Sequence, residues 1–388
     1  MSFDFDTPTV RLGTASYKWD GAKAEFHADD VLPLWVADMD FRCAPAISDA
    51  LHARVDHGIY GYTIRTSAYY NALCGWFARR DRWNINPDQL AFSPPGVIFG
   101  MAILIDLLTK PGDGVVMQTP NYDSLMDLVT KGGRRLYLNP MRKNSEKYEL
   151  DLNQLDALLQ KGNIRLLLMT NPNNPTGRLW TQHELSAMAA LCLRYGVTMI
   201  SDDIHSDIRP AGSTYIPLVT LSDEVAQHAV VCTSTNKTFN LGGLGMGTFI
   251  IPNRALRQAY EEKMKQYQTR LDNVFSTAAL IAAYTKCDEW VNAMNNQICQ
   301  NRALFESLLH EQLPQAISYP MDATYFAWID LNKLGKGPAL QDFLLHKCRV
   351  AFTPGSDFST DSASFVRVNL ACPHSILSEA VRRISVHL

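Results

Sequence analysis

The sequence predicts an α/β protein with a large, mostly parallel sheet and a smaller α+β part. Two observations predict the larger part. Short runs rich in β-branched residues alternate with helical patterns through the middle of the chain, and polar residues follow several of these runs. The chain has 388 residues, 46% of them hydrophobic, which is enough for a large core divided between about two domains.

The parallel sheet is predicted from five strands in the middle of the chain. They are Val115–Gln118, Ile164–Thr170, Val197–Ser201, Val230–Thr233 and Thr248–Ile251. Between the second and third, Thr181 and Glu184 form a T-x-x-E capping box, which predicts the start of a helix. Apolar residues then recur at helical spacing, and Gly196 suits the position just after the helix ends. A strand–helix–strand unit of ordinary length follows from this pattern.

The pattern changes beyond about residue 285. Strands are predicted at Tyr325–Asp330 and Phe365–Leu370, separated by helical stretches around Ala339–Lys347, and a final helix is predicted near Ser378–Ser385. We therefore expect a large domain over residues 45–285 and a small domain formed by residues 1–44 and 286–388.

Composition argues against several classes of function. The net charge is −3 without a lysine or arginine block, so neither nucleic acid nor a membrane surface is expected as a partner. The longest apolar run, Val97–Ile105, is far shorter than the roughly 18 residues of a membrane span. Eight cysteines form no CxxC pair, so no disulfide framework or metal site is predicted. The acidic N-terminus lacks an apolar signal region, and we expect a soluble cytoplasmic protein.

Three polar residues lie just past apolar runs, where ligands gather at the carboxyl ends of parallel strands. They are Asn174, Asp202 and Lys237, spaced 28 and 35 residues apart. Each has a role in pyridoxal 5′-phosphate (PLP) chemistry. The lysine forms a Schiff base and later acts as a base at the substrate Cα, and the aspartate keeps the pyridine nitrogen protonated. The asparagine amide can donate to the ring oxygen.

Each of these residues alone has an ordinary explanation. A single lysine is usually a solvated surface charge, an aspartate after a strand is often a helix cap or turn former, and Asn-Pro commonly starts a turn. The order and spacing of the three together favour a PLP site.

The cofactor's phosphate needs an anion site, and a helix predicted to open at Gly96 can supply one. We expect Gly96, Val97 and Ile98 to bind the phosphate, because free backbone N–H groups at a helix start suit an anion and a glycine allows close approach, although many helices begin this way without binding anything. Ser234, three residues before Lys237, could add a hydroxyl.

Three further segments concern the ring, the substrate and an interface. Tyr122 follows a strand and could stack on the cofactor ring, or be an ordinary core or rim tyrosine. Arg367 lies in an alternating apolar strand and either faces solvent or binds a carboxylate with its planar fork. Tyr60-Gly61-Tyr62 suits either core packing or an interface.

Read together, these segments resemble the fold-type I PLP-dependent enzymes, the aspartate aminotransferase superfamily, over essentially the whole chain. Asn174-Pro175-Thr176-Gly177 is similar to the family's NPTG motif, and Asp202 to its pyridine-nitrogen aspartate. Ser234-x-x-Lys237 is similar to the Schiff-base segment, and Arg367 to the arginine that binds the α-carboxylate.

Narrower matches resemble the bacterial cystathionine β-lyase/C–S lyase branch, which includes a maltose-system regulator. They lie in the segments 36–41, 58–62, 201–205 and 236–240. His205 stands where many transaminases have a tyrosine near the ring oxygen, although a buried structural histidine is the alternative. Many relatives also carry a phosphate-binding arginine where this chain has Gly245, and the lyase branch is similar in lacking it.

The resemblance implies further roles for residues of this chain. It implies catalytic roles for Lys237, Asp202 and Tyr122, and substrate contacts for Arg367, Asp38 and Asn174. It also places Tyr62 at the phosphate of the neighbouring subunit's cofactor, which implies a homodimer with shared active sites.

The function implied is α,β-elimination of cystathionine or a related cysteine S-conjugate to a thiol, pyruvate and ammonia. A thiol leaves far more readily than hydroxide, so a sulfur amino acid is a sensible substrate. An aminotransferase on the same scaffold is the main alternative. An additional regulatory role, in which the fold binds a transcription factor, is a second alternative that could coexist with catalysis.

Overall fold

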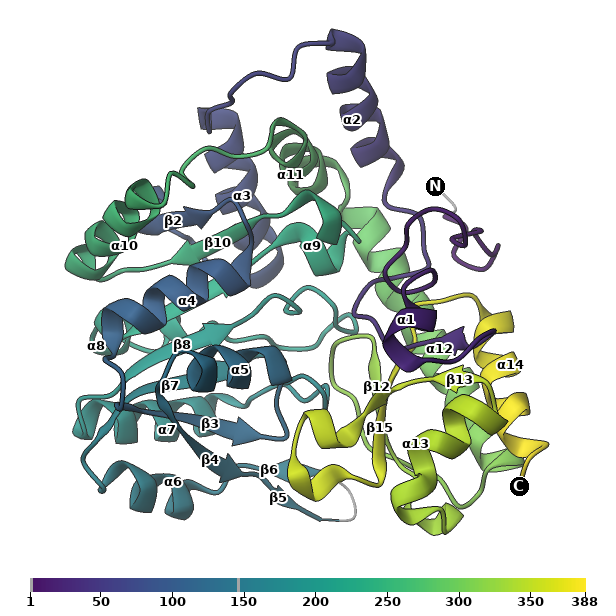
Figure 1. Cartoon of the computed structure of the whole chain (residues 1–388). Helices are drawn as coiled ribbons and strands as arrows, with labels where there is room; N and C mark the ends of the chain where they lie inside the picture. Colours follow the sequence, from purple (N-terminus) through teal and green to yellow (C-terminus); the bar gives the residue numbers. More distant parts are fainter. Residues whose placement is uncertain (1–2, 145–146) are drawn as a thin grey trace.

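A seven-stranded sheet forms the centre of the larger part of the molecule (Figure 1). The structure is a computed structural model that describes residues 3–144 and 147–388. In spatial order the strands are β2 (Leu90–Ser93), β10 (Gly247–Ile250), β9 (Ala229–Thr233), β8 (Thr198–Asp202), β7 (Ile164–Thr170), β3 (Gly114–Thr119) and β4 (Arg135–Pro140). The pairs from β9 to β4 are parallel, whereas β10 is antiparallel to both of its neighbours. The mostly parallel sheet predicted from the sequence is confirmed.

Each of the five predicted strands falls on a strand of this sheet, and Thr248–Ile251 falls on the antiparallel one. Between β9 and β10 the chain makes only the short helix α9 (Thr235–Thr238) and one further helical turn. No long helix crosses a face of the sheet there, and such a crossover is the usual connection between parallel strands. The chain therefore turns back on itself after Lys237.

Helices cover both faces of the sheet, because alternate strand residues point to opposite sides. Val230 and Cys232 of β9 belong to one apolar cluster, and Val231 belongs to the other. The first cluster is covered by α4 (Val97–Leu108), α5 (Asp123–Lys131) and α10 (Arg254–Gln266). The second includes residues of α3 (Ser67–Asp81), α6 (Leu152–Leu159), α7 (Gln182–Arg194) and α11 (Val274–Lys286). Polar side chains at the strand ends are left between these two layers.

The predicted capping box starts α7. The Thr181 hydroxyl accepts from the Glu184 N–H (3.2 Å), and the Glu184 carboxylate accepts from the Thr181 N–H (3.0 Å). Gly196 has φ +66° just past the helix end, a conformation that glycine adopts without strain. Both predictions are confirmed.

A four-stranded antiparallel sheet forms the centre of the smaller part. Its order is β11 (Ile317–Ser318), β12 (Phe326–Asp330), β15 (Phe365–Asn369) and β14 (Thr353–Pro354). The N-terminal segment joins this part through β1 (Leu32–Pro33), which pairs with β13 (Val350–Ala351). Figure 1 shows the purple N-terminal segment beside the yellow C-terminal elements. The boundary between 45–285 and the remaining residues stays a prediction.

The remaining elements connect these two sheets or flank them. They are α1 (Ala22–Phe26), α2 (Pro45–His57), β5 (Arg142–Lys143), β6 (Tyr148–Glu149), α8 (Asp223–Gln227), α12 (Asp288–Gln312), α13 (Leu340–Asp342) and α14 (His374–Ser385). The stretch predicted to be helical around Ala339–Lys347 holds α13 and a π-helical turn over Phe343–Lys347.

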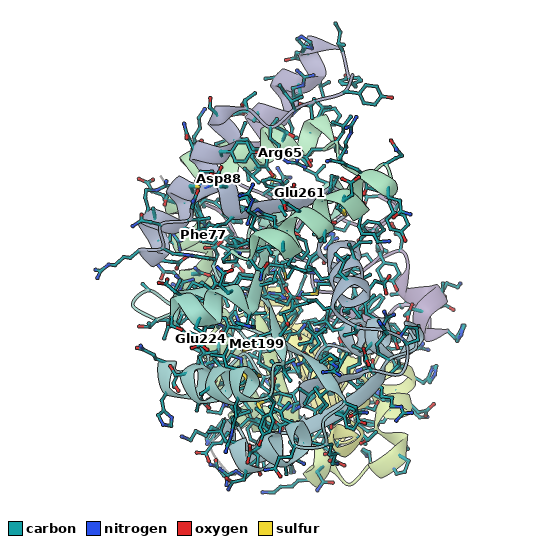
Figure 2. All side chains as sticks on the ribbon, turned by 90° about the vertical axis from the view of Figure 1, so that its left-hand side faces the viewer. Arg65, Phe77, Asp88, Met199, Glu224 and Glu261 are labelled. Carbon is teal, nitrogen blue, oxygen red and sulfur yellow. The ribbon has the colours of Figure 1, made fainter. Side chains whose placement is uncertain are left out.

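The core and the surface divide as expected for a globular α/β chain. Phe77 and Met199, labelled in Figure 2, are fully buried, whereas Asp88, Glu224 and Glu261 are exposed. One end of the molecule is different: α2 and the segment that follows it stand out from the body (Figures 1 and 2). Among the described residues, no helix combines the length and apolar character needed to cross a membrane.

Candidate active site

The predicted strand-end residues meet at one edge of the large sheet. Asp202 is the last residue of β8, Asn174 follows β7, and Lys237 lies in α9 directly after β9. They line one cavity of about 230 Å³. The predicted site residues around it are Gly96, Val97, Ile98, Tyr122, Asn174, Asp202, His205 and Lys237. Parallel strands with a shared direction bring these distant residues together.

The Lys237 amine is held inside the protein. Its Nζ donates to the Ala37 carbonyl oxygen at 2.8 Å. Burial, followed by the nearby Arg367 charge, lowers the pKa of Lys237 to about 8. A substantial fraction of this amine is therefore neutral near pH 7.5, and the neutral form is the one that acts as nucleophile and base.

Asp202 presents one carboxylate oxygen to the protein and the other to the cavity. Its Oδ1 accepts from the Ile204 N–H at 3.3 Å and lies 3.6 Å from Cys232 Sγ. Among the described residues, Oδ2 has no hydrogen-bond partner. Burial raises the pKa of Asp202 to about 6, so the carboxylate is ionised at neutral pH. A buried negative charge facing a cavity suits a protonated ring nitrogen.

His205 is buried and uncharged. The rings of Tyr325 and Phe326 lie with their centroids 5.6 and 5.4 Å from the imidazole. Burial, with the Lys237 and Arg367 charges, lowers the pKa of His205 well below its usual value. Its Nδ1 has no hydrogen-bond partner among the described residues. An orphaned buried nitrogen on a cavity-lining histidine fits a ligand that brings its own polar atoms.

The start of α4 closes one end of the cavity. Gly96 is the N-cap residue of α4 and has φ +120°, a backbone conformation that residues other than glycine rarely adopt. The unpaired N–H groups of the first helical turn follow it and suit a phosphate. Gly245, where many relatives carry an arginine, packs against this loop: a Cβ there would lie 3.1 Å from the Pro94 carbonyl oxygen. The residues present therefore fit PLP, with backbone donors at the phosphate end.

Arg367 points inward and does not face solvent. It is 4% exposed, and its guanidinium lies 4.1 Å from the centroid of the Phe326 ring. Nη1 donates to Asn174 Oδ1 at 2.9 Å, which ties the arginine to the NPTG segment. Burial lowers the pKa of Arg367 to about 10, so it stays charged at neutral pH. Its Nε has no partner among the described residues, which leaves a donor for a carboxylate.

Four predicted site residues are not among those that line this cavity: Arg367, which reaches it through its contact with Asn174, and the three that follow. The Ser234 hydroxyl donates to the Met246 carbonyl oxygen at 2.7 Å and caps α9. The Asp38 carboxylate is paired with Arg11 at 2.6 Å. Tyr62 is 95% exposed on the projecting segment after α2. The predicted roles of these three residues at the cofactor or substrate stay predictions.

The cavity also contains residues that the sequence argument did not single out. Thr170 ends β7, Ile204 follows the aspartate, and Asn236 precedes the lysine. The Ala37 carbonyl comes from the N-terminal segment and also accepts from the Tyr325 hydroxyl at 3.0 Å. Thr170 and Asn236 could have been found from their positions in predicted motifs. The Ala37 carbonyl could not, because a backbone group has no sequence signal.

Comparisons with known proteins agree with this geometry. The profile of the family "Aminotransferase class I and II" matches residues 30–384. The chain is 37% identical to cystathionine beta-lyase PatB of Bacillus subtilis, over 99% of this chain and 100% of that protein. It is 32% identical to protein MalY of Escherichia coli, over 98% and 97%. The crystal structure of cystalysin from Treponema denticola, which contains PLP, superposes with a TM-score of 0.95 at 28% identity, over 100% of this chain and 98% of that one.

Proposed function

The chain belongs to the class I and II aminotransferase family, and from this membership we propose that it is a PLP-dependent carbon–sulfur β-lyase. It cleaves cystathionine, or a related cysteine S-conjugate, to a thiol (homocysteine from cystathionine), pyruvate and ammonia. The observation that carries the proposal is the convergence of Lys237, Asp202 and His205 on one cavity at the start of α4. The full-length similarity to a cystathionine beta-lyase supports the sulfur substrate.

Named residues of the chain would hold the cofactor. Bound PLP supplies an aldehyde that reacts with amines and a ring that accepts the electrons released at the substrate Cα. Lys237 would hold the aldehyde carbon, and Asp202 would pair with the ring nitrogen. His205 and Asn174 would serve the ring oxygen, and the first turn of α4 would take the phosphate. Tyr122 lines the cavity as a candidate to stack on the ring.

The same residues then act on the substrate. Arg367 binds and orients its α-carboxylate. The free Lys237 amine would remove the Cα proton, a role for which a pKa of about 8 is well suited near neutral pH. The C–S bond breaks, and the sulfur leaves with the bonding electrons and takes up a proton. Water then hydrolyses the remaining enamine to pyruvate and ammonia.

Product analysis separates this reaction from transamination, which the family also performs. The purified protein is mixed with cystathionine and no 2-oxo acid. Elimination predicts pyruvate and homocysteine in equal amounts, and the Lys237→Ala variant should produce neither. A strict requirement for a 2-oxo acid acceptor would show that the protein is an aminotransferase.

The assembly and location of the protein complete the proposal. It is a cytoplasmic homodimer in which Tyr62 reaches the neighbouring active site. The exposed apolar side chains of Ile59, Tyr60, Tyr62 and Ile64 on one projecting segment support a protein interface there. Binding of a transcription factor is a separate prediction, which partner capture with wild type and Lys237→Ala would test.

A further inference from the structure

In the proposed function, the Asp202 carboxylate pairs with the ring nitrogen of PLP, and this role requires that the carboxylate be held in a fixed orientation. The neighbouring strand supplies a side chain for this purpose. In the parallel pairing of β8 with β9, Asp202 lies directly opposite Cys232. Paired residues of adjacent strands project their side chains to the same face of a sheet, so the register places the thiol beside the carboxylate.

The contact between them is direct. Cys232 Sγ lies 3.6 Å from Asp202 Oδ1, within range of a hydrogen bond from sulfur. The Ile204 N–H reaches the same oxygen at 3.3 Å. Both donors therefore act on Oδ1, while Oδ2 has no partner among the described residues and is left for the ligand. Two donors on one oxygen restrict rotation of the carboxylate about its Cβ–Cγ bond.

The thiol is a hydrogen donor in this setting. Cys232 is fully buried, and burial, with the neighbouring Asp202 and Asp203 carboxyls, raises the pKa of its thiol well above the usual value. The thiol thus keeps its proton at every pH at which the protein would work. The Ser201 carbonyl oxygen, 3.5 Å from the sulfur, is a second acceptor within its reach.

We propose that Cys232 is a positioning residue of the active site, whose thiol donates to Asp202 Oδ1 and fixes the carboxylate that meets the pyridine nitrogen. This inference rests on the proposed function for the role of Asp202. An apolar residue would fill the same space between the sheet and α4, but only a donor would also favour the ionised carboxylate. Neither residue composition nor the family resemblance assigns this role to Cys232.

Infrared spectroscopy tests the hydrogen bond without cofactor or activity. The S–H stretching band of Cys232 is isolated as the difference between apo wild type and apo Cys232→Ala. The proposal predicts that this band shifts to higher frequency in Asp202→Asn, whose neutral amide oxygen is a weaker acceptor. An unchanged band would assign the proton to the Ser201 carbonyl and overturn the proposal.

Variants test the consequence for the cofactor. Cys232→Ala removes the donor, and Cys192→Ala is the matched control, because Cys192 is equally buried but belongs to the other apolar cluster. Cys232→Ala should lower kcat roughly tenfold with KM changed less than about twofold, and weaken PLP binding by a similar factor. The pH at which the spectrum of the bound cofactor changes should also move. Cys232→Ser keeps a donor and should recover part of each loss.

The outcomes separate the two proposals. If Cys232→Ala matches wild type and Cys192→Ala in PLP affinity and in spectral pH dependence, Cys232 only fills space. If Cys232→Ser is as impaired as Cys232→Ala, the loss is one of packing, and the inference is likewise overturned. A wild-type protein that binds no PLP would instead refute the proposed function, and the infrared result on the apoprotein would still decide whether the thiol donates to Asp202.

Discussion

Burial sets the charge state of the residues that would do the chemistry. Burial lowers the pKa values of Lys237, Arg367 and His205; the Arg367 charge lowers that of Lys237 further, and the Lys237 and Arg367 charges lower that of His205 further. The result is a neutral imidazole, a charged guanidinium and an amine that titrates near neutral pH. These states suit the three proposed roles: contact of His205 with the cofactor ring, binding of the substrate carboxylate by Arg367, and proton transfer by Lys237.

The lowered pKa of Lys237 predicts how the apoprotein takes up PLP. Only the neutral amine attacks the aldehyde, so the rate of cofactor binding should rise with pH and reach half its maximum near pH 8. Stopped-flow absorbance with excess apoprotein measures this rate. A midpoint near 10.5, the ordinary lysine value, would show that the amine is not buried as described.

A substitution of Arg367 should affect substrate binding more than turnover. Arg367→Lys keeps the charge but loses the planar fork that can hold a carboxylate through two N–H groups. We expect KM for cystathionine to rise on the order of tenfold or more, with a smaller change in kcat. Steady-state kinetics on the holoenzyme check this. An unchanged KM would show that Arg367 does not bind the substrate. Arg382→Lys, on the exposed face of α14, is the control.

At the scale of elements, the N-terminal segment is fixed to the active site by a buried ion cluster. Lys18 is fully buried and its Nζ lies 2.6 Å from Asp40. Arg11 pairs with the same carboxylate at 2.7 Å, and the Trp19 indole donates to it at 2.9 Å. This cluster anchors the segment that carries Ala37, whose carbonyl accepts from the Lys237 amine.

Loss of the Asp40 charge should therefore be costly. Asp40→Asn removes the carboxylate that lies 2.6 Å from the buried Lys18 ammonium and leaves it only the longer contact of 3.7 Å with Asp38 among the described residues, so we expect a loss of about 3–5 kcal/mol in unfolding free energy. Lys23→Ala breaks an exposed pair with Asp29 that solvent screens, and it should leave the unfolding free energy close to that of the wild type. Denaturant unfolding of the two apoproteins measures both. Equal losses would contradict a structural role for the cluster.

The sequence could predict the elements better than their contacts. The runs over Ile164–Thr170 and Val230–Thr233 predicted β7 and β9 because short, largely apolar runs between helical patterns are typical of buried strands. The reversal at β10 depends on how the chain packs after Lys237, and no local pattern encodes it. The pairing of Asp202 with Cys232 depends on register, and the capture of Asp38 by Arg11 depends on a contact 27 residues apart in the sequence. Asp38 was predicted from resemblance alone to contact substrate.

At the scale of the whole molecule, the projecting segment indicates a partner. Tyr62 is 95% exposed, and Tyr60 and Ile64 beside it are also exposed. On an isolated monomer these side chains would lie in water. In a homodimer with two-fold symmetry, the same segment would reach the partner's site from both directions.

Mixed dimers test whether active sites are shared. Tyr62→Ala and Lys237→Ala variants, each weakly active or inactive alone, are unfolded together and refolded at equal concentration. Half of the dimers then carry one of each subunit, and in these one of the two sites has both native residues. We expect about a quarter of the wild-type activity. No recovery above the separate variants would place Tyr62 outside the neighbouring site.

Chemical mapping of the modified residue decides whether Lys237 carries PLP. Holoprotein is reduced with borohydride, digested and analysed by mass spectrometry. We expect the mass of a reduced pyridoxyl phosphate group on Lys237, and none on any peptide of the Lys237→Ala variant. Cofactor attached to a different lysine, or absent from the wild-type protein after incubation with PLP, would contradict it.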